Sequence, residues 1–434
     1  MKLILSIFVI VLLQHFSFAQ NYTSYFTGDV EDAVVSPLGG ICMMGGATEH
    51  VDAMKWFLER SGGGDILVIR ASGSDGYNDY LFSDLGISVN SVETIVFHNA
   101  QAATDSYVLE QIANAEAIWM AGGDQWNYVD YWRDNQVSQI INENIASKNI
   151  VIGGTSAGMA VLGGIYFSAE FGTITSTTAL QNPYNNAITI SNDPFFNVPF
   201  LENTITDTHY DDPDRRGRHI TFLARAVKDW GVNAKGIACD EYTSVCIDTD
   251  GKAYAFGDFP NYDENVYFLQ VNCVAPNEPE LCEAGDNLNW VRNNQAIKVY
   301  HIQAETTGSK YFDLNNWEEG SGGIWENWFV DNGILNIEPG DPIDIIGCEF
   351  SSTQNILAEQ IEFFPNPLTE DFLQIKNKFH QIDRVEVFDA QGKKVFEKNK
   401  KQYIYNIDFS NFPKGIYFVK VFSNEFFLTK KIIR

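Results

Sequence analysis

One pentapeptide in the sequence has the residue types and spacing of a catalytic serine. Ser156 stands in the segment Gly-Thr-Ser-Ala-Gly at 154–158, after the apolar run 149–153 and before the small residues 159–163. Glycines two positions before and after a serine allow a sharp turn from a strand into a helix, because a β-carbon there would meet the neighbouring backbone. Such a turn lifts the hydroxyl above backbone amides that can hold an oxyanion. The pattern predicts a nucleophile; the alternative is a glycine-rich turn that binds an anion or packs closely.

A nucleophilic serine needs a base to take its proton and an acid to orient that base. The best base is His209, which follows a predicted strand at 203–205 and therefore stands at a strand's end. The next predicted strand, 235–239, ends in Asp240 and Glu241, and either carboxylate could orient the imidazole. The alternative for an isolated histidine among polar residues is a structural role.

The strands that would position these side chains alternate with helices. Between Ile41 and Asp250, apolar runs typical of buried strands are separated by amphipathic stretches such as 48–60 and 128–147. The runs lie at 65–70, 92–97, 117–120 and 150–152. This alternation predicts an α/β fold with a doubly wound, mostly parallel sheet, whose ligands gather at the carboxyl ends of the strands. The segment 258–340 is rich in Asn, Glu, Trp and Gly and is predicted to be a β-rich extension.

The N-terminus and the charge indicate an exported chain. The first 20 of the 434 residues combine Lys2, an apolar run at 3–13 and a small residue before Gln20, the pattern of a cleaved signal peptide. No later stretch is apolar enough for a transmembrane helix. The net charge of −28 argues against nucleic acid or an anionic membrane as a partner.

Six cysteines in an exported chain permit disulfides. Cys273 and Cys282 bracket a loop-like segment and are the best candidate pair. The other cysteines cannot be paired from the sequence: Cys42, Cys239, Cys246 and Cys348. The histidines are scattered, and neither Cys-x-x-Cys nor His-Glu-x-x-His occurs, so no metal site is predicted.

The end of the chain has the composition of a separate module. From Pro365 onward there are 13 Lys and Arg against 8 Asp and Glu, the reverse of the acidic balance before it. Alternating segments such as 385–389 and 414–421 predict a small β-sandwich. The Pro-Asn-Pro start, the Lys-Gly-Ile-Tyr segment and the basic end resemble the type A sorting domain of the Bacteroidetes type IX secretion system. That resemblance implies export through the periplasm to the cell surface or beyond; a carbohydrate-binding or adhesive sandwich is the alternative.

Motifs in the acidic body carry a second resemblance. Their order is Gly-Gly-Asp-Gln at 122–125, Gly-Thr-Ser-Ala-Gly at 154–158, Asp-Thr-His-Tyr at 207–210, Arg-Arg-Gly-Arg at 215–218 and Asp-Glu-Tyr-Thr at 240–243. Together they resemble cyanophycinase and its relatives in the serine peptidase family that includes aspartyl dipeptidase E. The resemblance implies a fold similar to class I glutamine amidotransferases, with serine in place of their cysteine.

The resemblance also implies roles for single residues. It makes Ser156 the nucleophile, His209 the general base and Glu241 the orienting acid. It places the oxyanion hole at the backbone amides of Gly123 and Ala157. The positions that match substrate-binding residues are Gln125, Asp207, Arg215 and Arg218. The alternative for the two arginines is ion pairing at the surface with Asp211, Asp212 and Asp214.

These roles imply a secreted serine exopeptidase that requires no cofactor and no metal. Its substrate would be cyanophycin, a poly-aspartate with arginine on each β-carboxyl, or a related aspartyl or β-aspartyl-arginine peptide. Pro213 stands where cyanophycinases carry another arginine, so the dipeptide specificity stays open. The alternatives are another aspartyl or isoaspartyl dipeptidase and a catalytically idle surface binding protein. A glutamine amidotransferase is a weaker reading, because no cysteine occupies the turn.

The expected organisation is therefore a signal peptide at 1–20, a cyanophycinase-like peptidase domain at 21–346, a linker at 347–362 and a sorting domain at 363–434. The expected partners are the peptide substrate and the type IX secretion machinery. A homodimer is compatible with the sequence.

Overall fold

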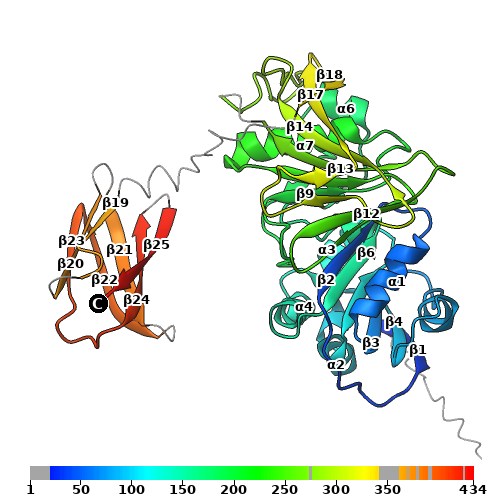
Figure 1. Ribbon diagram of the computed structural model, residues 1–434, viewed down its shortest axis with the longest axis horizontal. Helices are drawn as coiled ribbons and strands as arrows, with labels where there is room; N and C mark the ends of the chain where they lie inside the picture. The colour runs from blue at the N-terminus through cyan, green and yellow to red at the C-terminus, as the bar shows by residue number, and fades with distance from the viewer. Residues whose placement is uncertain are drawn as a thin grey trace, which may run out of the picture. The chain divides into compact units, whose positions relative to one another are not determined.

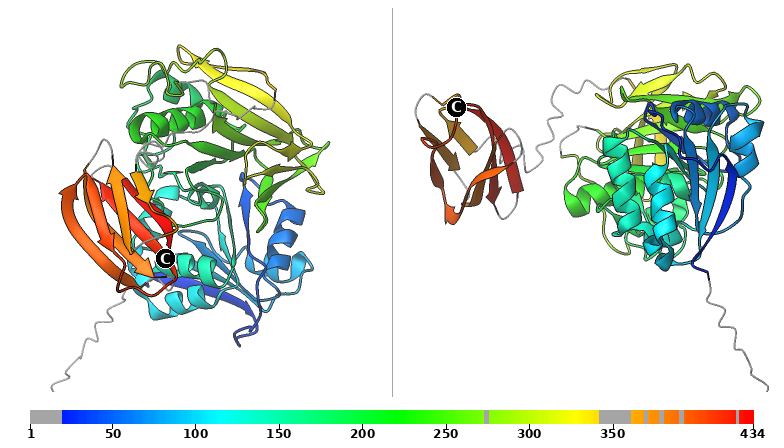
Figure 2. Two further views of the ribbon diagram at one scale, coloured as in Figure 1. Left: turned by 60° about the vertical axis from the view of Figure 1, so that its left-hand side comes forward. Right: turned by 90° about the horizontal axis from the view of Figure 1, so that it is seen from below.

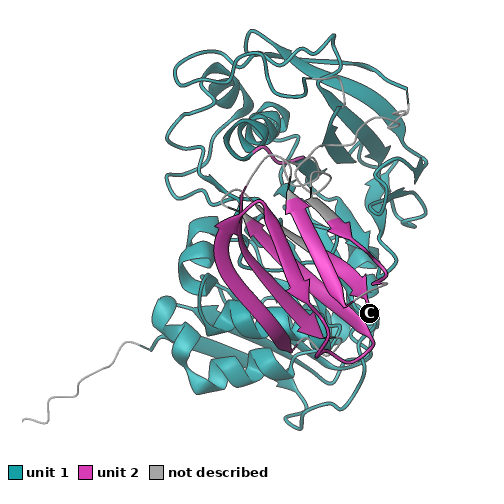
Figure 3. Ribbon diagram, turned by 90° about the vertical axis from the view of Figure 1, so that its left-hand side faces the viewer, with its two compact units in different colours: residues 1–230, 234–343 teal, residues 231–233, 344–434 magenta. Residues whose placement is uncertain are grey.

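The structure is a computed structural model that describes residues 20–272, 276–341, 361–368, 371–377, 381–389, 393–423 and 426–434. The predicted signal peptide up to residue 19, Cys273, Cys348 and most of the predicted linker lie outside these ranges. The chain divides into two compact units, one of residues 1–230 and 234–343 and the other of 231–233 and 344–434 (Figure 3). Among the described residues, no helix is long and apolar enough to cross a membrane.

The larger unit contains a mixed sheet of 10 strands whose centre is parallel. Its order is β1-β4-β3-β5-β6-β2-β11-β12-β15-β16. The parallel strands are β4 (Ser91–Phe97), β3 (Asp65–Arg70), β5 (Ala117–Met120), β6 (Val151–Thr155) and β2 (Gly40–Met44). They are buried almost throughout, as continuous apolar strands covered on both faces should be. The antiparallel strands at the edges are β1 (Tyr22–Gly28), β11 (Ser244–Ile247), β12 (Lys252–Phe259), β15 (Tyr311–Asp313) and β16 (Gly320–Ser321).

Helices cover both faces of the parallel centre (Figures 1 and 2). In β3, Ile66 and Val68 share a core with α1 (Val51–Arg60), whereas Leu67 and Ile69 share a core with the helices of the opposite face. Those helices are α2 (Ser106–Asn114), α3 (Gln125–Trp132) and α4 (Gln136–Ser147). The shorter connecting helices are η1 (Tyr80–Asp84), η2 (Ala100–Thr104), α5 (Ala157–Ala160) and α6 (Ser176–Gln181). The parallel sheet with helices on both sides confirms the predicted α/β class.

A second sheet differs from the prediction of one mostly parallel sheet. Its order is β18-β17-β14-β13-β10-β9. Only β9 (Thr204–Asp207) and β10 (Lys235–Cys239) are parallel; α7 (Arg216–Trp230) connects them. The antiparallel strands are β13 (Asn265–Val271), β14 (Ile297–Gln303), β17 (Ile324–Asp331) and β18 (Ile334–Pro339). These antiparallel strands lie in the extension at 258–340, which is β-rich as predicted, and β13 pairs with β10. A small two-stranded sheet joins β7 (Tyr166–Phe167) and β8 (Ile190–Ser191).

The smaller unit is a β-sandwich, as predicted. One sheet has the order β19-β20-β23 and the other β22-β21-β24-β25. Both contribute to one buried core, with Leu373 and Ile407 from the first sheet and Val385 and Val419 from the second. The strands of this unit are β19 (Ile361–Phe364), β20 (Phe372–Asn377), β21 (Ile382–Asp389), β22 (Lys394–Gln402), β23 (Ile404–Asp408), β24 (Ile416–Ser423) and β25 (Phe426–Ile433).

Of the predicted pair of Cys273 and Cys282, Cys273 lies outside the described residues, so the pairing stays a prediction. Cys282 is a free, buried thiol, and Leu281 beside it pairs with Asn289 in a short antiparallel bridge. Burial raises the pKa of the Cys282 thiol to about 12, and the positive charge of Arg225 in α7 opposes this rise. Within the part of the chain that the structure describes, no cluster of His, Cys, Asp and Glu could hold a metal ion.

Candidate active site

Ser156 occupies the predicted turn between β6 and α5. Its backbone has φ of 52° and ψ of −115°, a conformation that residues with a side chain rarely adopt. A β-carbon on Gly154 would lie 2.6 Å from the carbonyl carbon of Gly158, and one on Gly158 would overlap the Met120 carbonyl. The N–H of Ser156 donates to the Met44 carbonyl at 3.0 Å, which fastens the turn to β2. The flanking glycines therefore serve the close approach that the sequence predicts.

His209 follows β9 and reaches the serine. Its backbone is also left-handed, with φ of 48°, and its N–H donates to the Gly45 carbonyl at 2.8 Å. A β-carbon on Gly46 would overlap the imidazole, so the loop after β2 packs directly against the ring. Nε2 of His209 lies 2.8 Å from Oγ of Ser156. The end of β2 thus positions the imidazole beside the hydroxyl.

The carboxylate that meets the other side of the imidazole belongs to Glu241. Its Oε1 lies 2.5 Å from Nδ1 of His209. The side chain of Asp240 is directed elsewhere, and its Oδ2 accepts the N–H of Asn265 at 2.9 Å. The N–H of Glu241 donates to Oδ1 of Asp211 at 3.0 Å, which helps to fix the turn after β10. Of the two carboxylates that the sequence left open, the one that the family resemblance favours makes the contact.

This chain of contacts has the geometry for acyl transfer. A carboxylate at Nδ1 favours the imidazole tautomer that carries its proton there, so Nε2 is free to accept the proton of Ser156. The side chains of His209 and Glu241 are 22% and 23% exposed, so the pair is shielded but still reachable from solvent. Partial burial strengthens the attraction between an imidazolium and its carboxylate once the proton has moved.

Ser156 and His209 open into a cleft of about 360 Å³. Gly123 and Ala157, whose amides are the predicted oxyanion hole, both line it beside Ser156. Gln125, the first residue of α3, also lines it, and its side-chain amide donates to the Phe167 carbonyl. Gly123, Gln125, Ser156 and Ala157 therefore meet at the carboxyl ends of β5 and β6, and His209 reaches the same cleft from the end of β9.

The predicted substrate-binding charges fall into two kinds. Arg218 and Asp207 form an ion pair whose side chains are only 4% and 3% exposed. Burial opposes the charge of Asp207, but the Arg218 guanidinium outweighs it and holds the pKa of that carboxyl below its ordinary value. Arg218 still borders the cleft, whereas Asp207 is not among its lining residues. Their main contact is with each other, so their contribution is to shape the wall.

Arg215 bonds a backbone carbonyl, whereas Arg218 pairs with a carboxylate. Its Nη1 donates to the Thr208 carbonyl at 2.9 Å, and its side chain lines the cleft. Burial, together with the nearby Arg218 charge, lowers the pKa of Arg215 to about 10. The surface ion pair that the alternative reading expected belongs instead to Arg216, whose Nε lies 2.6 Å from Oδ1 of Asp214. Pro213 is exposed and is not among the lining residues.

Sequence reasoning missed two acidic side chains in the cleft. Asp124 lines it and caps α3 by accepting the N–H of Trp126 at 3.0 Å. Glu170 lines it from the loop between β7 and α6. Asp124 could have been found within the Gly-Gly-Asp-Gln motif, but nothing in the sequence around Glu170 marks it.

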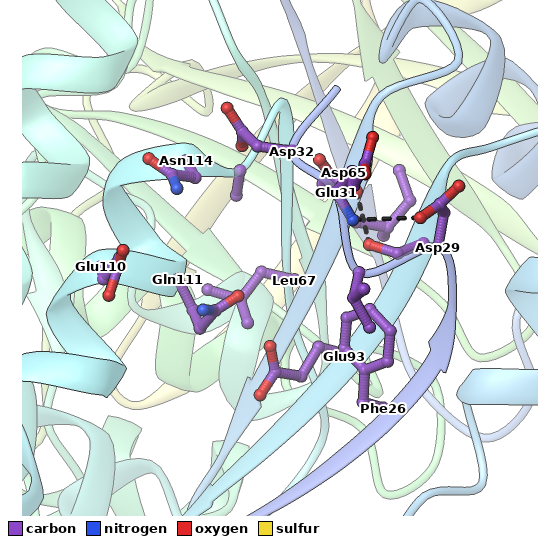
Figure 4. A pocket seen from close by; sticks show the side chains of 14 residues that line it. Phe26, Asp29, Glu31, Asp32, Asp65, Leu67, Glu93, Glu110, Gln111 and Asn114 are labelled. Atoms are coloured by element: carbon purple, nitrogen blue, oxygen red, sulfur yellow. Dashed lines mark hydrogen bonds between the residues drawn. The ribbon is translucent and has the colours of Figure 1, made fainter. Parts of the chain in front are cut away.

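A second cavity, of about 190 Å³, lies between α2 and the strands β3 and β4 (Figure 4). Acidic side chains line it, including Asp65 and Glu93. Asp65 binds within the protein, accepting from the N–H of Ala33 at 2.9 Å and from Asn90 at 2.8 Å. Glu93 accepts from Tyr107 at 2.8 Å, and burial raises its pKa. The lining includes neither Ser156 nor His209, so the cleft above is the candidate for catalysis.

Comparison with known proteins finds two family models that match parts of the chain. Residues 74–185 match the model of peptidase family S51, and residues 362–434 match that of the secretion system C-terminal sorting domain. The S51 match contains Ser156 and its turn, whereas His209 and Glu241 lie beyond it. The sorting domain indicates that the chain is exported.

Similar proteins include the cyanophycinase of Trichormus variabilis, 22% identical over 50% of this chain and 70% of the relative. The cyanophycinase of Geminocystis herdmanii is 24% identical over 47% of this chain and 76% of the relative. Among solved structures, a peptidase from an acI-B1 Actinobacterium matches with a TM-score of 0.39 and 16% identity, over 52% of this chain and 89% of that one. The family S51 match and the cyanophycinase relatives indicate a serine-type peptidase, and the second family match indicates a C-terminal sorting domain of a secretion system.

Proposed function

We propose that the protein is a secreted serine exopeptidase that cleaves bonds next to aspartyl residues, in cyanophycin or in related β-aspartyl-arginine peptides. The observation that carries this proposal is the hydrogen-bonded chain from Ser156 through His209 to Glu241 at the edge of an open cleft. In this mechanism Ser156 is the nucleophile, His209 the general base and Glu241 the group that orients and stabilises the imidazolium.

The reaction follows from the positions of these groups. His209 Nε2 takes the hydroxyl proton as Oγ of Ser156 attacks the scissile carbonyl. The amides of Gly123 and Ala157 stabilise the oxyanion that forms. The imidazolium then gives its proton to the leaving amine, and the acyl group stays on Ser156. Water, deprotonated by His209, attacks the ester, and the imidazolium returns this proton to Oγ of Ser156 as the acid is released. No step in this sequence requires a cofactor.

The cleft has positively and negatively charged side chains, which supports a substrate that carries both a carboxylate and a cation. Arg215 supplies a guanidinium that suits an aspartyl carboxylate, and its lowered pKa of about 10 still leaves it charged at neutral pH. Glu170 and Asp124 supply carboxylates on the same cleft, which suit a guanidinium or an ammonium group. A β-aspartyl-arginine unit carries both kinds of group.

The position of Pro213 favours a second candidate, another aspartyl or isoaspartyl dipeptidase. Pro213 is exposed and lies outside the cleft lining, so this position supplies no third cation to the substrate. Such an enzyme would use the same Ser156 chemistry with less dependence on an arginine side chain in the substrate.

The test is to incubate the purified mature protein with cyanophycin and with a panel of aspartyl and isoaspartyl dipeptides. Release of β-Asp-Arg from cyanophycin supports the first substrate, and preference for the dipeptides supports the second candidate. Ser156→Ala is the control, because it should lower kcat at least ~10³-fold while the protein still folds. Substrate binding without turnover by the wild type would indicate the idle binding protein instead.

A further inference from the structure

The structure brings together two cysteines that lie far apart in the sequence. Cys42 of β2 and Cys246 of β11 are directly opposite each other in the antiparallel pair of these strands. Their sulfur atoms are 3.6 Å apart. Both side chains are fully buried in the core beneath α1, where Sγ of Cys42 also lies 3.8 Å from the Ala53 carbonyl.

The backbone at this position can accept a covalent link. Directly opposite residues of an antiparallel pair have Cα atoms roughly 4.5–5.5 Å apart. That range lies within the roughly 4.4–6.8 Å that disulfides span, and two such side chains point to the same face of the sheet. Only a rotation of the two thiols and a closer approach of the sulfurs are needed.

Export exposes the chain to oxidising conditions. The C-terminal sorting domain indicates export, and exported proteins pass through an oxidising compartment. We propose that Cys42 and Cys246 form a disulfide bond in the exported protein. This inference does not depend on the proposed substrate.

The oxidant is the disulfide of a protein thiol oxidase met during export. The thiolate of one cysteine attacks that disulfide, forms a mixed disulfide and releases one thiol of the oxidant. The thiolate of the second cysteine then attacks the bound sulfur of the first and releases the other thiol. Two electrons pass to the oxidant, and the protons of Cys42 and Cys246 pass to its two thiols or to solvent.

The reaction must precede the closing of the core. Neither sulfur is reachable in the folded protein, and burial holds the pKa of the Cys246 thiol well above its ordinary value. The reactive thiolate is therefore scarce once α1 covers the sheet. For the same reason, the bond should resist reductants until the protein unfolds.

The bond would act close to the candidate active site. The Gly45–Gly46 segment after β2 accepts the N–H groups of His209 and Tyr242, and the turn before β11 contains Glu241. A link between Cys42 and Cys246 would fix the register of the two strands that lead into this region. We expect the effect on stability and not on the chemistry itself.

The direct test uses the full chain recovered after export. The protein is unfolded without reductant in excess N-ethylmaleimide, digested and analysed by mass spectrometry, and the same is done after reduction. The expected result is a peptide pair joined through Cys42 and Cys246 that disappears on reduction. Complete labelling of both cysteines before reduction, or a link from either to another cysteine, would overturn the proposal.

Thermal unfolding supplies a second readout. The oxidised wild type should melt about 5–10 °C above protein that was unfolded, reduced and refolded under reducing conditions, because the bond closes a long loop. In Cys42→Ala this difference should vanish, whereas Cys239→Ala, another buried cysteine, should keep it. Equal melting temperatures of the oxidised and reduced wild type would count against the bond. The comparison of oxidised with reduced wild type needs no variant, so it tests the bond even if Cys42→Ala does not fold.

Discussion

Gly46 lies directly against the imidazole of His209, so closely that a methyl group on residue 46 would overlap the ring. Gly46 also has φ of 119°, which a residue with a β-carbon adopts only under strain. The glycine that follows β2 thus sets the place of a histidine that is distant in sequence.

This contact predicts the result of Gly46→Ala. The added methyl should push the imidazole away from Ser156 and lower kcat on the order of 10²-fold, because a displaced base no longer meets the hydroxyl. Gly86→Ala is the matched control, since Gly86 also has a positive φ, of 72°, but nothing within 4 Å of an added β-carbon. Steady-state kinetics with circular dichroism check both variants. Equal losses in the two variants would show that backbone strain, and not the imidazole, causes the effect.

Glu241→Gln should lower kcat by about 10³–10⁴-fold with little change in KM. An amide at Nδ1 cannot stabilise the imidazolium and can favour the wrong tautomer. Asp240→Asn, one residue away, should stay within about threefold of the wild type, because Asp240 binds Asn265 and not the imidazole. Kinetics on one aspartyl dipeptide suffice. If the Asp240 variant lost activity and the Glu241 variant kept it, the role of Glu241 would be wrong.

The sequence predicts best where the structure depends on local spacing. The turn around Ser156 follows from its two glycines, and His209 was found because it stands just after a predicted strand. The strand end at 235–239 left Asp240 and Glu241 open, and the family resemblance chose Glu241. The sorting sandwich follows from alternating strands and its terminal motifs. In each of these cases, the type and spacing of neighbouring residues carry the signal.

The sequence predicts less where distant segments must pair. Nothing in the sequence near β10 indicates that β13 pairs with it. The sequence therefore did not show that β10 belongs to a second sheet and not to the first. The facing of Cys42 and Cys246 depends in the same way on the pairing of β2 with β11. Arg215 and Arg218 look alike in the sequence, and both line the cleft, but Arg218 in α7 forms an ion pair with the buried Asp207.

The pH dependence of stability should reflect Asp240. Burial, with the nearby Asp211 charge, raises the pKa of the Asp240 carboxyl to about 7 from an ordinary value of 3.8. Between about pH 4 and 7 the folded protein therefore binds more protons than the unfolded chain, and stability falls as the pH rises through this window. The loss attributable to this group is about 2–4 kcal/mol.

Asp240→Asn removes the ionisation and keeps an acceptor for the N–H of Asn265. Its stability should therefore fall less than that of the wild type between about pH 4 and 7. A residual slope is expected from Glu116, whose pKa burial also raises to about 7. Urea unfolding at several pH values measures both proteins. Parallel curves for wild type and variant would remove Asp240 as the cause.

Arg215 should bind the aspartyl carboxylate of the substrate. Arg215→Ala should lower kcat/KM about 10- to 150-fold on every aspartyl substrate, because one charge-assisted contact contributes about 1.5–3 kcal/mol. Arg216→Ala is the control, since Arg216 is paired with Asp214 and does not line the cleft. If Arg215→Ala and Arg216→Ala had equal activity, a residue other than Arg215 would bind the substrate carboxylate.

Glu170→Gln should lower kcat/KM only on substrates that carry a cationic side chain. If Glu170 meets a cationic side chain, the variant loses kcat/KM on β-Asp-Arg substrates about 3- to 10-fold, less than a buried contact because Glu170 is exposed. On isoaspartyl peptides with a neutral second residue it should match the wild type. Raised salt should narrow the difference, since exposed charges are screened. Glu202→Gln, an exposed acid outside the cleft lining, controls for net charge. A uniform loss on all substrates would mean that Glu170 supports its loop and does not select the substrate.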